Sequence, residues 1–187
     1  MWTLDGLTGV VFPCDRHDGK DDEIVRTLRK LASYNAWANQ VMFETIGGAP
    51  PELLEASAKG SYGSIEETVK HLVSVENAYL AMLQGRDPEA VLGPAGEYYG
   101  HDLTWFAERS RQLGDAYEAL LQGKDESWLE STFQVPWMDH PMTRRDGLLQ
   151  VFTHSSLHRA QVLSELGASG MEVPDVDYNM IAARLNA

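Results

Sequence analysis

The chain has 187 residues, of which 43% are hydrophobic and 23% charged, a composition that fits one soluble domain able to bury a core without disulfides. Its 28 acidic residues outnumber 15 basic ones and give a net charge of −13, so the phosphate backbones of nucleic acids and anionic membranes are not expected partners. The single cysteine, Cys14, cannot form an internal disulfide, and no stretch approaches the roughly 18 consecutive apolar residues of a membrane span, so a cytoplasmic protein is expected.

Two helices are predicted in the first half of the chain. Apolar residues at helical spacing predict the first from about Asp22 to Ile46, and a Gly-Gly-Ala-Pro-Pro run ends it. Ser64 and Glu67 have the spacing of a capping box and predict the start of a second helix, which ends before Gly85.

Two more helices are predicted in the second half, after a long crossover at residues 85–100 that has glycine and proline at both ends. The third helix runs from about Asp102 to Leu121. The fourth begins after Thr143, which can act as its cap, and extends to Gly167. Helices of this number and length predict an all-α fold, a four-helix bundle with a long crossover connection.

The chain divides into three predicted parts. Residues 1–21 lack a clear helical period and form an N-terminal extension. Residues 22–170 form the four-helix bundle domain. Residues 171–187 form a C-terminal tail with a short helical turn around Ile181.

The strongest chemical signal is the pair His154 and His158 in the fourth helix. Residues four apart lie on one helix face, so both imidazoles can converge on one point. Val151 and Val162 point in nearly the same direction as His158, which places the pair on the inward, apolar stripe. A metal ion would satisfy such buried rings, because neutral imidazole is a good ligand for transition metals.

A third nitrogen could come from His71, which borders the apolar stripe of the second helix. Three protein ligands leave a coordination position open for water or substrate, as in catalytic sites. The residues alone favour two interpretations about equally. One is a metal site made of the three histidines. The other is that His154 and His158 are core residues with ordinary hydrogen-bond partners and that His71 is unrelated to them.

The segments YNAWANQ, GSIEETVKHLVSVE and TRRDGLLQVFTHSSLHRAQ, in this order, resemble the DinB/YfiT-like superfamily. Their most specific mark is the H-x-x-x-H-R-x-Q run that begins at His154. The resemblance implies a four-helix bundle with a crossover, a homodimer, and one divalent metal held by three histidines at the positions of His71, His154 and His158. It also implies chemistry with low-molecular-weight thiols, since characterised relatives include transferases and an isomerase that use bacillithiol or mycothiol.

Three further side chains lie close to the histidines along the sequence. Gln161 lies close to the face of His154 and could orient a ligand or a bound water, or could simply face solvent. Glu67, one turn before His71, could act as a base or additional ligand, although its capping role explains it more simply. Arg159 is expected to face solvent. No catalytic residue is assigned.

Two functions follow from these residues. The first is a metal-dependent enzyme in which zinc or nickel, with iron or manganese as alternatives, activates a water or a small thiol for transfer or hydrolysis of a small-molecule substrate. The second is a non-catalytic, metal-stabilised dimer that acts in stress response or as an interaction protein. A di-iron bundle is disfavoured, because neither His154 nor His158 has a glutamate three residues before it.

Overall fold

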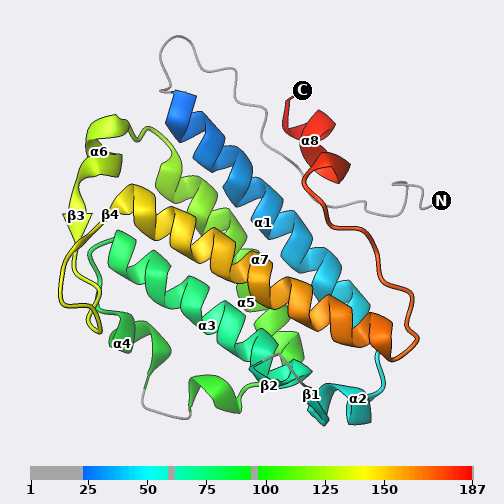
Figure 1. The fold of residues 1–187 in the computed structure, drawn as a ribbon. Coiled ribbons are helices and arrows are strands. Elements are labelled where there is room, and N and C mark those ends of the chain that lie inside the picture. The colour runs from blue at the N-terminus through cyan, green and yellow to red at the C-terminus, as the bar shows by residue number, and fades with distance from the viewer. Residues whose placement is uncertain (1–22, 59–61, 94–96, 187) are drawn as a thin grey trace.

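The computed structural model describes residues 23–58, 62–93 and 97–186. Four long helices account for most of this part of the chain: α1 (Glu23–Gly47), α3 (Ile65–Leu83), α5 (Leu103–Leu121) and α7 (Arg144–Ala168). Figure 1 shows them packed along one another as a bundle, which confirms the predicted all-α fold. The predicted extension, residues 1–21, lies outside the described residues. Within those residues, no helix combines the length and apolar character needed to cross a membrane.

The order of the helices in space follows from one long connection. In Figure 1, α3 and α5 run in the same direction, because the chain between them returns along the bundle before α5 begins. This crossover contains the short helix α4 (Pro88–Leu92) and a 3-10 turn at Tyr98–Gly100. The closest pairs in the bundle are α1 with α5 and α3 with α7. The pairing of α3 with α7 brings together the two helices that carry the candidate ligands.

Both of these helices begin at side-chain caps that the sequence predicts. The Ser64 hydroxyl accepts a hydrogen bond from the backbone N–H of Glu67, whose carboxylate accepts one from the N–H of Ser64, which completes a capping box at the start of α3. At the start of α7, the Thr143 hydroxyl accepts a hydrogen bond from the N–H of Asp146. The caps therefore fix the first turn of each ligand-bearing helix.

A small two-stranded hairpin leads into each of the same two helices. The first pairs β1 (Ser57–Ala58) with β2 (Gly63–Ser64), after the short helix α2 (Pro51–Glu55). The second pairs β3 (Thr132–Phe133) with β4 (Met142–Thr143), after α6 (Glu126–Glu130). Strands of two residues show no alternation of polar and apolar residues, so the sequence did not predict them.

The core lies between the four long helices. Val151 and Val162, which were expected on the inward stripe of the fourth helix, are fully buried. A smaller apolar cluster joins α8 (Asn179–Leu185) to the outer side of α1, where Ile181 packs against Trp37. The C-terminal segment is therefore attached to the bundle by its own buried side chains.

Candidate metal centre

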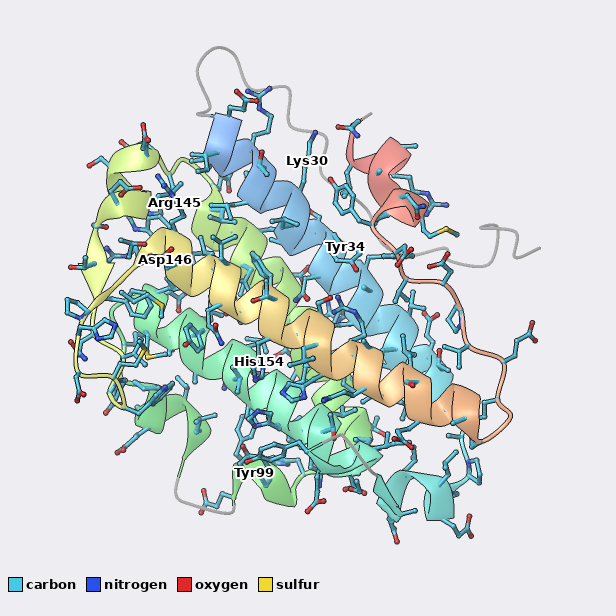
Figure 2. The ribbon with its side chains drawn as sticks, viewed as in Figure 1. Lys30, Tyr34, Tyr99, Arg145, Asp146 and His154 are labelled. Atoms are coloured by element: carbon cyan, nitrogen blue, oxygen red, sulfur yellow. The ribbon has the colours of Figure 1, made fainter. Side chains whose placement is uncertain are left out.

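Three histidines meet where α3 and α7 pack together. His154 and His158 lie one turn apart on α7, and His71 faces them from α3. The Nε2 atom of His154 is 3.2 Å from that of His71 and 3.2 Å from that of His158. The candidate ligand atoms of the three residues all lie within 4.8 Å of one another. Figure 2 shows His154 where α7 passes α3.

This spacing fits a shared metal ion. Imidazole nitrogens bind zinc at about 2.0–2.1 Å, so two of them on one ion lie roughly 3 Å apart. In the described part of the chain, the group that could hold an ion consists of these three histidines, without a carboxylate. His71 and His154 are half-buried and His158 is buried, so the site lies at the edge of the core. The three residues could hold a metal ion.

The hydrogen-bond partner of His158 determines where its proton lies. Its Nδ1 is 2.7 Å from Oε1 of Gln161, and a carbonyl oxygen can only accept, so Nδ1 carries the hydrogen. The Nε2 atom, the other nitrogen of this ring, faces His154. This hydrogen bond to Gln161 therefore fixes the orientation of the His158 ring.

The three rings do not satisfy one another by hydrogen bonds alone. Nε2 of His154 faces two other Nε2 atoms but carries either one hydrogen or one lone pair, so it can make one good hydrogen bond and not two. Its Nδ1 is buried and has no hydrogen-bond partner among the described residues. A cation at the common centre would interact favourably with all three nitrogens at once.

The local environment keeps two of the rings neutral. Burial, and to a smaller extent the charge of the nearby His158, lower the pKa of His71 from 6.5 to about 4. The pKa of His154 is also lowered to about 4, mainly by burial and then by the charges of His158 and His71. At neutral pH both rings therefore have a free lone pair, the form that metal binding requires.

One aromatic side chain covers part of the cluster. The ring of Tyr62 stacks on that of His71, with centroids 3.9 Å apart and planes 9° apart, and it meets His158 edge-on at 6.4 Å. The sequence did not suggest this residue, because it lies outside the predicted helices and reaches the histidines through the β1–β2 hairpin.

Glu67 and two further histidines lie outside the cluster. Glu67 completes the capping box, so its carboxylate is already bonded to the backbone of Ser64. His140, in the connection before α7, is exposed, and the exposed His101 stacks on Trp105, with centroids 4.1 Å apart. None of these three belongs to the histidine cluster.

Arg159 is buried, although its sequence position predicted a solvent-facing side chain. Its side chain is 1% exposed, and its Nη1 donates to the Oδ1 atoms of Asn39, at 2.6 Å, and Asn35, at 3.1 Å. The expectation was wrong because α7 packs against α1 as well as α3, so a wide sector of the helix is buried.

Arg159 belongs to a buried polar network that continues to Glu76 on α3. Oε1 of Glu76 accepts hydrogen bonds from Asn35 at 2.7 Å, Asn39 at 2.9 Å and Ser155 at 2.7 Å. Burial raises the pKa of Glu76, while these hydrogen bonds and the charge of Arg159 act in the opposite direction. The network joins α1, α3 and α7.

This network also affects the histidines. Ser155 and Arg159 each follow a histidine of α7 by one residue, so fixing them against α1 and α3 fixes the face that His154 and His158 present to His71. The signal that could have revealed it is the repeated four-residue spacing of polar residues, Asn35 with Asn39 and Ser155 with Arg159, on helices with a buried stripe.

The fold and the cluster together define a helical-bundle protein with a three-histidine site that could hold a metal ion. The model of the DinB family matches residues 24–184, and the chain belongs to this family. Among curated proteins, the chain is similar to Protein DinB from Bacillus subtilis (strain 168), with 22% identity over 156 residues that cover 81% of this chain and 91% of the relative.

Proposed function

We propose that the protein is a metal-dependent enzyme of the DinB type, in which His71, His154 and His158 hold one divalent transition-metal ion. The observation that carries the proposal is the convergence of three Nε2 atoms, two pairs of them 3.2 Å apart, from two helices. Zinc or nickel are the first candidates, with iron or manganese as alternatives, because imidazole nitrogens accept all of these ions.

Three protein ligands leave room for a further ligand, and this supports a catalytic role. A bound metal would lower the pKa of a water or a thiol in the open position and so supply a nucleophile at neutral pH. The protein's own part is to keep His71 and His154 neutral by burial and to orient the His158 ring through its hydrogen bond to Gln161.

The specific reaction is transfer or hydrolysis on a small-molecule substrate, with a low-molecular-weight thiol as the proposed co-substrate. This version depends on the resemblance to thiol-using members of the superfamily. The same resemblance supports a homodimer. The net charge of −13 supports a protein that does not bind nucleic acid, and the single cysteine supports a cytoplasmic location.

A second candidate function is a non-catalytic dimer stabilised by the metal, in stress response or as an interaction protein. The observation that favours it is the absence of a carboxylate from the histidine group in the described part of the chain, which leaves no general base at the cluster itself. Chelation would then lower the thermal stability of the protein strongly, but no turnover would accompany metal loading.

An activity screen separates the two. The metal-loaded protein is incubated with model electrophiles and a panel of small thiols, with water alone as a further nucleophile. A His154→Ala variant is the negative control, and His140→Ala, an exposed histidine outside the cluster, is the matched control. Turnover by wild type and His140→Ala but not by His154→Ala supports the enzyme. The second candidate is supported if the protein binds metal, turns over no combination of electrophile and nucleophile, and melts at a much lower temperature once a chelator removes the metal.

A further inference from the structure

Tyr62 combines an exposed ring with a close contact to a candidate ligand. Its side chain is 57% exposed, yet one face of the ring lies flat on the imidazole of His71 at 3.9 Å between centroids. The residue under this ring is one of the three candidate ligands. The same ring meets His158 edge-on, so it touches the histidines of both helices.

The local sequence holds Tyr62 in this place. Its backbone N–H donates to the Thr68 hydroxyl at 3.1 Å, and that hydroxyl donates to the carbonyl of Ser64 at 2.7 Å. The next residue, Gly63, has a φ of +108°, and a Cβ there would lie 2.2 Å from Oε2 of Glu67, the atom that completes the capping box. The turn and the cap therefore fix the chain directly before α3, and with it the tyrosine.

The geometry of the stack suits a restraint on a metal ligand. The lone pair of Nε2 lies in the plane of the imidazole, so a ring on the face of His71 leaves the direction of metal binding open. The stack resists rotation of His71 about its Cβ–Cγ bond, as the hydrogen bond to Gln161 does for His158. Binding a cation withdraws electron density from the imidazole, which strengthens its contact with the electron-rich face of tyrosine.

We infer that Tyr62 is a positioning residue of the metal centre, which holds His71 in its metal-binding orientation by aromatic stacking. This inference depends on the proposed metal site and adds a residue from outside the two ligand-bearing helices. The ring and not the hydroxyl performs the role, because the contact is between ring faces.

The test compares three variants of the full chain. Tyr62→Ala removes the ring, Tyr62→Phe keeps it without the hydroxyl, and Leu157→Ala truncates a side chain of the same exposed fraction, 57%, directly beside His158. Zn²⁺ affinity is measured by competition with a chromogenic chelator, and the site is examined through the visible spectrum of the Co²⁺-loaded protein. Thermal unfolding of the metal-free proteins shows whether each variant folds.

Loss of one aromatic pair predicts a Zn²⁺ affinity weakened by roughly 2- to 12-fold in Tyr62→Ala, with an altered Co²⁺ spectrum. Tyr62→Phe and Leu157→Ala should have the Zn²⁺ affinity and the Co²⁺ spectrum of the wild type. Wild-type affinity and spectrum in Tyr62→Ala would overturn the inference, as would a loss in Tyr62→Phe equal to that in Tyr62→Ala. If the wild type binds none of Zn²⁺, Ni²⁺, Fe²⁺ and Mn²⁺ in the same competition, the proposed function fails and the inference fails with it.

Discussion

Replacing Arg159 with methionine tests whether the buried polar network holds the bundle together. Arg159 is 1% exposed, and its Nη1 donates to Oδ1 of both Asn35 and Asn39. Without these donors, two buried acceptors lose their partners at about 1–3 kcal/mol each. Glu76, which is 2% exposed, also loses its opposite charge. The two unpartnered acceptors and the buried charge left without compensation together predict a loss of about 3–5 kcal/mol.

The free energy of unfolding of the metal-free protein, from urea titration with a chelator present, measures this loss. A reduction of about 3–5 kcal/mol would be a large part of the roughly 5–15 kcal/mol typical of a native domain. Arg111→Met is the control, since Arg111 bonds to Glu108 and Asp115 on the exposed surface and its loss should change stability by no more than about 0.5 kcal/mol. The reasoning is refuted if the two variants lose the same small amount.

Three further predictions concern the histidines and the packing of the helices. The metal-free protein should lose stability as the pH falls from 6.5 toward about 4, because the unfolded chain takes up protons at His71 and His154 before the folded protein does; thermal melts across this window measure it. Gln161→Ala should weaken Zn²⁺ binding by roughly 10- to 100-fold, measured by chelator competition, because His158 loses its orienting partner. Gly114→Ala should destabilise the protein by about 1–3 kcal/mol in urea unfolding, because the added Cβ would lie 2.7 Å from that of Ala36 on α1.

Each of the three has a control that isolates its cause. The fall in stability with acid should become shallower in the double variant His71→Ala/His154→Ala, and an unchanged slope would contradict the assignment. Gln161→Glu keeps an acceptor for Nδ1 and should bind Zn²⁺ more tightly than Gln161→Ala. Gly47→Ala adds a methyl group with nothing within 4 Å, so a loss there equal to that in Gly114→Ala would show that close packing is not the reason.

The four long helices could be predicted from local sequence because each has its own helical period and two have recognisable caps. Ser64 with Glu67 and Thr143 with Asp146 mark the starts of α3 and α7, and both caps are present. The hairpins could not be predicted, since strands of two residues are stabilised by their place between helices and not by a pattern of their own.

The candidate site could be predicted only in part. The four-residue spacing of His154 and His158 determines that both lie on one face of α7, whichever helix packs there. Their meeting with His71 depends on the pairing of α3 with α7, which the resemblance implied and which the spacing of residues along a single helix does not contain. Tyr62 reaches the cluster through a turn, and Arg159 is buried by a third helix, so tertiary packing determined both.

The metal content of the purified protein tests the central claim most directly. Elemental analysis of the wild type should find one divalent transition-metal ion per chain, and His71→Ala, His154→Ala and His158→Ala should each lose most of it, whereas His140→Ala should retain it. A wild type without stoichiometric metal, or one whose metal survives all three cluster substitutions, would contradict the account.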